Sequence, residues 1–150
     1  MRALLLEKLY EWSLIPYQSF KKNAAWNVGI EDLLQYPKPT LGYQMGSFLL
    51  LHNFDLQEKL ESHDVFHVLT GTGITVPEEI SMQFYLLGNG KRSAYLFTVI
   101  LIGGFLFPDY YKLFSAKYRQ GKSSLPFHQL DFYKLLDQPL DRIKSTFSIP

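Results

Sequence analysis

The longest apolar segment of the chain, AYLFTVILIGGFLF at residues 94–107, contains no charged side chain. Its fourteen residues fall short of the roughly 20 that a helix needs to cross a bilayer. We therefore expect a core helix that can also touch lipid. Of 150 residues, 47% are hydrophobic and 19% are charged, which favours a well-filled core over disorder. This length predicts one domain, residues 1–150.

Turn residues divide the chain into segments with helical patterns. Asp55 and Glu58 have the D-x-x-E spacing of a capping box, and Gly71 is placed to end the helix that follows. Thr75 and Glu78 repeat this spacing as T-x-x-E. The predicted helices are residues 2–13, 41–52, 56–70, 75–87, 91–105, 108–119, 128–136 and 139–147. Strand patterns are poor outside the apolar segment. The predicted fold class is all-α, a single-domain helical bundle.

Charge and cysteine content narrow the classes of function. The formal net charge is +1 and the basic residues are scattered, so nucleic acid is not an expected partner. The chain has no cysteine, which excludes disulfides, thiolate nucleophiles and cysteine-ligated zinc, and fits a reducing compartment. Glu7 and Glu11 interrupt the N-terminal MRALLLEKLYEW, so this stretch is typical of neither a secretory signal nor a mitochondrial transit peptide.

Two histidines and three acidic residues lie in SHDVFHVLTGTGITVPEE, residues 62–79. On a helix, His63 and His67 share one face, with Asp64 beside them. The GTGIT loop turns the chain back, so an antiparallel helix pair would bring Glu79 opposite His67. Two imidazoles and two carboxylates suit a zinc or iron(II) ion, with room for water or substrate. The pattern indicates a candidate metal site between two antiparallel helices.

Ordinary helix packing offers another interpretation, in which His63 is a hydrogen-bonded core histidine and Asp64 a solvated charge. The two adjacent glutamates are expected to differ, because Glu78 occupies the N3 position of the capping box and Glu79 is free to coordinate. A third interpretation is an HD-type metal phosphohydrolase, which needs an upstream histidine and a downstream aspartate on other helices. His52 is the only upstream histidine and lies too near in sequence.

The segment HDVFHVLTGTGITVPEE resembles the signature of the ubiquinone (coenzyme Q) biosynthesis protein four family, which is H-D-x-x-H, eleven residues, then E. The signature falls on His63, Asp64, His67 and Glu79. TLGYQMGSFLLLHNFD resembles the family's upstream helix, and QPLDRIKSTFSI resembles its closing P-L-x-x-[IL]-R-x-x-[LF]-x-I tail. The resemblance covers about residues 40–149, with its landmarks in the same order.

The chain also departs from the family pattern. Family members usually carry glycine before the ligand glutamate, where this chain has Glu78, an extra acid near the site. Aromatic residues around Phe132 and Tyr133 replace the family's tryptophan-glutamate pair, and the N-terminal region is reduced. These differences bear on the substrate more than on the metal.

The resemblance implies a helical protein that binds a zinc ion, or iron(II), through His63, Asp64, His67 and Glu79. It implies a peripheral position on the inner membrane, on the cytoplasmic side in a bacterium or the matrix side in a mitochondrion. The implied ligand is a polyprenylated benzoate intermediate of quinone synthesis or another isoprenoid lipid. Other quinone-biosynthesis proteins are the expected partners, and a homodimer is an open alternative.

The implied activity is metal-dependent, oxidative removal of the C1 carboxylate from the ring, so the same four residues are candidate catalytic groups. The ion would act as a Lewis acid or assist oxygen chemistry. If Asp64 does not coordinate, it would be an orienting partner or proton acceptor. The other family-derived interpretation is a lipid-binding scaffold with a structural ion. An open coordination position favours catalysis, and a closed four-ligand site favours a structural ion.

The polyprenyl tail would need an apolar groove. Residues 94–107 and 48–51 are the candidate lining, with Gly103 and Gly104 allowing a close approach of the lipid chain. Lys91 and Arg92 precede the apolar segment, where they could meet lipid headgroups.

Overall fold

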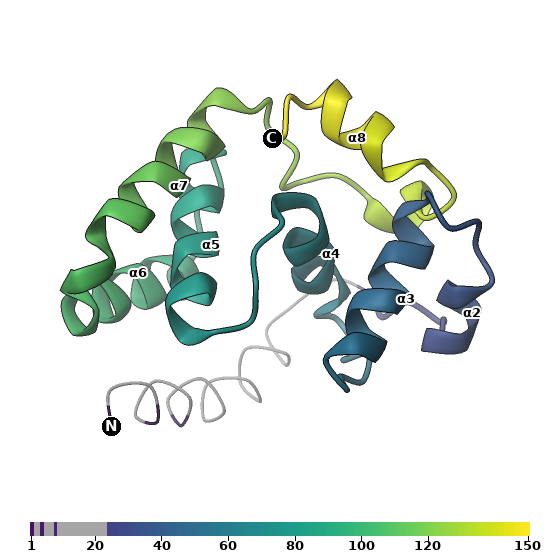
Figure 1. Ribbon diagram of the computed structural model, residues 1–150, viewed down its shortest axis with the longest axis horizontal. Coiled ribbons are helices and arrows are strands. Elements are labelled where there is room, and N and C mark those ends of the chain that lie inside the picture. Colours follow the sequence, from purple (N-terminus) through teal and green to yellow (C-terminus); the bar gives the residue numbers. More distant parts are fainter. Residues whose placement is uncertain (2–3, 5–7, 9–23) are drawn as a thin grey trace.

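The computed structural model describes residues 24–150 together with Met1, Leu4 and Lys8. The predicted helix at residues 2–13 falls almost wholly outside the described residues. The helices are α2 (Ile30–Leu34), α3 (Leu41–Leu51), α4 (Glu61–Thr70), α5 (Val76–Gly88), α6 (Ala94–Leu106), η1 (Pro108–Tyr110), α7 (Tyr111–Ser123), η2 (Phe132–Leu135) and α8 (Leu140–Thr146). Helices α5, α6 and α7 form one end of the molecule and α2, α3 and α8 the other, with α4 between them (Figure 1).

The all-α prediction is confirmed. Among the described residues, the one β-type contact is an isolated antiparallel bridge between Thr40 and Pro139. Gly71 ends α4 with a φ of 60°, as a left-handed cap requires. The capping box at the start of α5 also forms, because the main-chain N–H of Thr75 donates to Glu78 Oε2 over 3.0 Å.

The predicted start of α4 is wrong. The helix begins at Glu61 rather than near residue 56, and Leu60 is its N-cap without a side-chain hydrogen bond. Lys59 has a φ of 67°, a left-handed conformation that a right-handed helix cannot continue through. Leu60 is buried just after it. Asp55 and Glu58 therefore precede the helix and do not cap it. The burial of Leu60, a tertiary contact, outweighs the local helix-start pattern.

The predicted helix at residues 128–136 is reduced to the short 3₁₀ helix η2. The segment before η2 is hydrogen-bonded to Asn89 at the end of α5. Asn89 donates its amide N–H to the Leu125 carbonyl over 3.0 Å, and its Oδ1 accepts the N–H of Phe127 over 3.0 Å. These long-range bonds fix the path of the chain just before the predicted start of the helix.

Two clusters of buried side chains share α5. The larger lies where α2, α3, α4 and α5 meet the C-terminal segments, and includes Leu33, Met45, Leu49, Val65, Phe66, Leu69, Met82, Tyr85, Leu86, Phe127 and Phe132. The smaller consists of Ile80, Phe107 and Phe114, between α5, α6 and α7. Because α4 and α5 both contribute to the larger cluster, their relative position is set by packing.

Helices α5 and α7 cross at two glycines. A Cβ atom at Gly88 would overlap the carbonyl oxygen of Tyr118, and one at Gly121 would overlap the carbonyl oxygen of Tyr85. The two backbones therefore touch directly, and no other residue type fits at either position without moving a helix.

Helix α6 is only half covered. Leu96 and Gly103 are buried, whereas Phe97, Leu101 and Phe105 are exposed, Phe105 to 84%. The predicted core helix thus leaves one apolar face open. No single described helix is long and apolar enough to cross a membrane, whereas α6 and the segment Pro108–Ser123 reach that length and composition only as a pair bent by 103°.

Candidate metal centre

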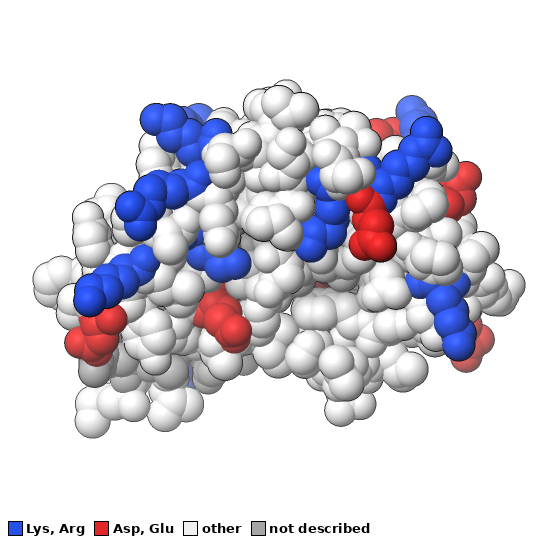
Figure 2. Space-filling model, turned by 45° about the horizontal axis from the view of Figure 1, so that its top comes forward, with Lys and Arg blue, Asp and Glu red and all other residues white. Residues whose placement is uncertain are grey.

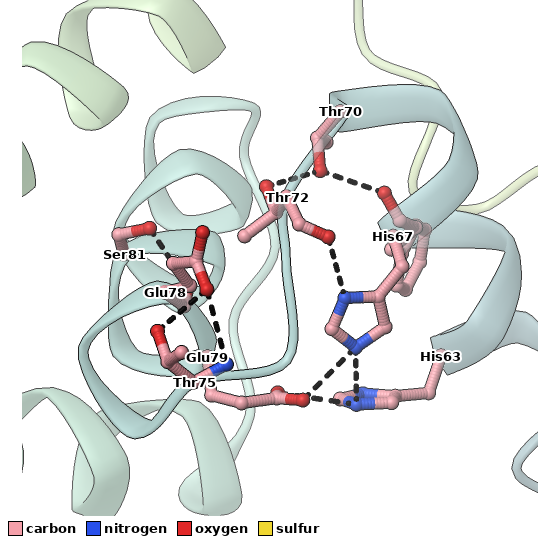
Figure 3. A network of polar contacts seen from close by, with 9 residues as sticks. His63, His67, Thr70, Thr72, Thr75, Glu78, Glu79 and Ser81 are labelled. Atoms are coloured by element: carbon pink, nitrogen blue, oxygen red, sulfur yellow. Dashed lines mark hydrogen bonds and ion pairs between the residues drawn. The ribbon is translucent and has the colours of Figure 1, made fainter. Parts of the chain in front are cut away.

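Three side chains from α4 and α5 meet at one point (Figure 3). His63 and His67 lie one turn apart on α4, and their Nε2 atoms are 3.2 Å from each other. Glu79, in the first turn of α5, places Oε2 3.3 Å from His63 Nε2 and Oε1 3.0 Å from His67 Nε2. In the part of the chain that the structure describes, this is the one group of three such donors able to hold a metal ion.

The separations between the donor atoms fit a bound ion. A tetrahedral zinc ion with bonds of about 2.0–2.1 Å places its ligand atoms about 3.3 Å apart. Neighbouring ligands of an octahedral ion with bonds of about 2.1 Å lie about 3.0 Å apart, as in the two-histidine, one-carboxylate iron sites. The observed range of 3.0–3.3 Å fits both geometries, so the donor set accommodates either metal.

The orientation of His67 is fixed from behind. Its Nδ1 donates to the main-chain carbonyl of Thr72 over 3.0 Å, which leaves Nε2 unprotonated in the neutral ring. The Phe48 ring of α3 stacks on the imidazole with a centroid distance of 5.2 Å and an interplanar angle of 19°. His67 is only 3% exposed. A histidine held in this tautomer by a carbonyl is the usual arrangement of a metal ligand.

The side chain of Thr72 is tied to the end of α4 by hydroxyl hydrogen bonds. The Thr70 hydroxyl donates to the carbonyl of Phe66 over 2.7 Å and lies 2.6 Å from the Thr72 hydroxyl (Figure 3). The left-handed Gly71 between the two threonines makes this return of the chain possible. The turn after α4 thus connects the end of the helix to His67, through the Thr72 carbonyl.

The charges of the site are strongly coupled. Burial alone would raise the pKa of Glu79, but hydrogen bonds and charge from His63 and His67 outweigh it and lower the pKa to about 2. Burial alone would lower the pKa of His67, but the hydrogen bond and charge of Glu79 outweigh it and leave the pKa above its ordinary value. A cation is therefore stabilised at this point, as a proton or as a metal ion.

Asp64 stands outside the three-donor group. Burial raises the pKa of its carboxyl to about 6, against the opposing charges of His63 and His67. It is therefore close enough to interact electrostatically with the donors, but the structure does not bring its oxygens among them. Coordination by Asp64 stays a prediction, and a place beside the donors fits the alternative of a proton acceptor.

Glu78 has the capping role expected for it. Its Oε2 accepts from both the main-chain N–H and the hydroxyl of Thr75, and it does not belong to the donor group. The upstream His52 packs its ring edge-on against Phe48 and likewise lies outside the group. The structure thus separates the two adjacent glutamates and gives no support to a site built on His52.

Sequence reasoning missed three contributors to the site. Thr72 acts through its main-chain carbonyl, which every residue type carries, so no sequence signal marks it. The stacking of Phe48 depends on how α3 crosses α4. Glu61, buried in the first turn of α4, helps to raise the pKa of Asp64 through its charge, and it accepts the main-chain N–H of Trp26 over 2.8 Å, a contact between residues 35 apart in sequence.

Comparison with known proteins identifies the fold. No protein-family model matches the chain. No curated protein matches it either. Among solved structures, the chain is similar to a crystal structure of a proposed ubiquinone biosynthesis protein from Nostoc punctiforme, with a TM-score of 0.71 and 17% identity over 99% of this chain and 82% of that one. The chain thus has the fold of a protein described as related to ubiquinone biosynthesis.

Proposed function

We propose that the protein acts in quinone biosynthesis, in the metal-dependent, oxidative removal of the C1 carboxylate from a polyprenylated hydroxybenzoate. The observation that carries this proposal is the meeting of His63, His67 and Glu79 with separations that suit a metal ion. The shared fold with a protein described as a proposed ubiquinone biosynthesis protein supports the assignment to quinone chemistry. Zinc and iron(II) both fit the donor set.

The number of donors favours catalysis. Structural zinc sites are normally closed by four protein ligands, whereas catalytic sites keep a position for water or substrate. Three donors converge among the described residues, and His63 and Glu79 are partly exposed, which is compatible with a position for water or substrate. A bound ion would supply a Lewis acid for the carboxylate or a neighbouring phenolic oxygen.

The side chains of the protein have distinct roles in this proposal. His67, whose Nδ1 donates to the Thr72 carbonyl, would present the Nε2 of its neutral ring to the ion. Glu79 supplies negative charge at the same point, and its low pKa keeps it ionised. Asp64, beside the donors, would accept or return the proton at the ring. Loss of the carboxylate as CO₂ would leave its bonding electron pair on the ring carbon. One oxygen atom of dioxygen would form the hydroxyl at that carbon, and a two-electron reductant with two protons would convert the other oxygen atom to water.

The second candidate is a lipid-binding scaffold with a structural ion. It would be favoured if Asp64 turned inward and closed the site as a fourth ligand. The scaffold would organise other quinone-biosynthesis proteins, whereas the enzyme needs an open position at the same ion.

We place the reaction at a membrane surface, on the inner face of a bacterial or mitochondrial inner membrane. The open face of α6 presents Phe97, Leu101 and Phe105 at intervals of four residues. All the charged residues of the next helix, α7, are basic: Lys112, Lys117, Arg119 and Lys122. In Figure 2, basic side chains lie over this end of the molecule, with acidic side chains below them. Apolar contact with acyl chains and attraction to anionic headgroups would hold such a surface on lipid.

Glu79→Gln tests the enzyme proposal, with Glu78→Gln as its matched control. Each variant replaces one of two adjacent carboxylates with a neutral group of the same shape. In a host that lacks its own homologue, Glu79→Gln should fold, stay on the membrane, and accumulate the carboxylated precursor. Glu78→Gln should support quinone synthesis, because glutamine still serves the capping box. Normal quinone levels with folded Glu79→Gln protein would reject the enzyme in favour of the scaffold.

A further inference from the structure

Gln83 is a buried amide one turn beyond the metal donor Glu79. Both residues lie on α5, and residues four apart on a helix share a face with Cβ atoms about 5–6 Å apart. Gln83 is 2% exposed. Its side chain therefore projects from the same side of α5 as the carboxylate that completes the donor group, and is shut off from solvent.

The Oε1 atom of Gln83 is buried and accepts no hydrogen bond from any described residue. Nearly all buried polar groups in folded proteins have a partner, because leaving one unpaired forfeits the hydrogen bonds it made with water. Methionine or leucine would fill a similar volume without this penalty. Because no described residue donates to Oε1, the partner of this amide must lie elsewhere, and a bound ligand can supply it.

Gln120 of α7 also has an unpaired buried Oε1. It does not share this setting, because α7 packs on a different face of α5, against Tyr85 and Gly88. At 100° per residue, Tyr85 and Gly88 point well away from the direction shared by Glu79 and Gln83. Only the Gln83 amide adjoins the metal donors along one helix face.

We propose that Gln83 binds the hydroxyl of the aromatic substrate, an inference that rests on the proposed function. Oε1 is an acceptor, so its partner must donate a hydrogen, which a phenolic hydroxyl does and a carboxylate does not. If the carboxylate of a hydroxybenzoate lies at the three metal donors, its ring hydroxyl would extend toward Gln83, one turn further along α5. Gln83 is thereby a specificity residue that distinguishes hydroxybenzoates from benzoates without the hydroxyl.

The test compares two probes on three proteins loaded with zinc: wild type, Gln83→Met and the control Glu78→Gln. The probes are 3-prenyl-4-hydroxybenzoate and 3-prenylbenzoate, which differ only in the hydroxyl, and their dissociation constants are measured by calorimetry. Wild-type protein should prefer the hydroxylated probe by roughly 10–100-fold, the range that one hydrogen bond to a buried polar group provides. Gln83→Met should lose this preference, keep its zinc content, and unfold at a higher temperature than wild type. Glu78→Gln, the control, should keep the preference.

Each outcome decides the inference. A Gln83→Met protein that prefers the hydroxylated probe as strongly as wild type would overturn it and indicate a buried water as the partner of Oε1, while leaving the proposed function intact. If wild type binds neither probe, the proposed function and the inference both fail. Should Gln83→Met not fold, the wild-type comparison alone remains decisive, because equal affinity for the two probes excludes a built hydroxyl site.

Discussion

Helix α5 is held by main-chain contacts on the side of α7 and carries polar side chains on the side of α4. Toward α7, Gly88 and Gly121 let the two backbones touch, with no space for a Cβ atom. Toward α4, Glu79 reaches across to two histidine nitrogens at 3.0 and 3.3 Å. The contact with α7 depends on the absence of side-chain atoms at two glycines, whereas the contact with α4 depends on the nitrogen and oxygen atoms of His63, His67 and Glu79. The packed side gives α5 the fixed position that the metal side needs.

The largest effect is expected on the metal side. His67→Ala removes the best-held donor, so bound metal should fall to near zero, a loss larger than the roughly 100-fold caused by removing an outer partner of a ligand. Elemental analysis of purified protein measures this. His52→Ala is the control, because that histidine lies outside the donor group and should leave the metal in place.

Stoichiometric zinc or iron in folded His67→Ala protein would contradict the assignment of the site. The far-ultraviolet circular dichroism of the variant must therefore match that of wild type, since His67 is also buried in the core. Metal retained by His67→Ala but lost by His52→Ala would move the site toward α3.

The next largest effect is expected on the packed side. Gly121→Ala forces a Cβ atom against the Tyr85 carbonyl and should lower the free energy of unfolding by about 3 kcal/mol, the upper end for overpacking. Gly104→Ala is the matched control, because its Cβ would meet nothing within 4 Å. In a helix this change should be neutral or stabilise by about 0.5–1 kcal/mol. Urea denaturation measures both, and equal losses would show that the crossing is not the tight contact described.

A smaller effect is expected at the open face of α6. Exchanging Leu101 and Phe105 for serine should weaken binding to anionic liposomes by at least about 10-fold for each residue, since each loses apolar area that lipid would bury. The same change at Leu50 and Leu51, which are also exposed, is the control on α3. Loss of binding in the α3 variant alone would place the lipid contact at the other end of the molecule.

The smallest effect is expected from His128, which anchors the loop after α7 to the end of α5. Burial lowers its pKa, with a smaller opposing contribution from its contact with the Asn89 carbonyl, while Lys91 and Arg92 lower it further. The unfolded chain therefore binds this proton more readily than the folded one, so the folded state loses stability as pH falls below about 6.5.

His128→Gln should reduce this pH dependence. Between pH 7.5 and 5.5, wild type should lose more of its unfolding free energy than the variant, as measured by urea denaturation at each pH. An identical pH profile for both proteins would show that His128 titrates alike in the folded and unfolded states.

The agreement between sequence and structure is greatest where the deciding contacts are local. The Thr75–Glu78 box spans three residues, and Gly71 is a cap within one turn of its helix. The start of α4 was mispredicted because the left-handed Lys59 and the buried Leu60 depend on the rest of the fold. Local patterns predict a helix end well only when no long-range contact competes with them.

What the sequence by itself determined is the helical class, the shared face of His63 and His67, and the difference between Glu78 and Glu79. All of these follow from interactions within about one helical turn. Only the tertiary structure decided that three donors meet while Asp64 stands aside, and that the carbonyl of Thr72 orients His67. The exposure of one face of α6 is also decided only by the tertiary structure. The physical reason is that these features depend on how helices cross and which groups lose water, and no short stretch of sequence contains that information.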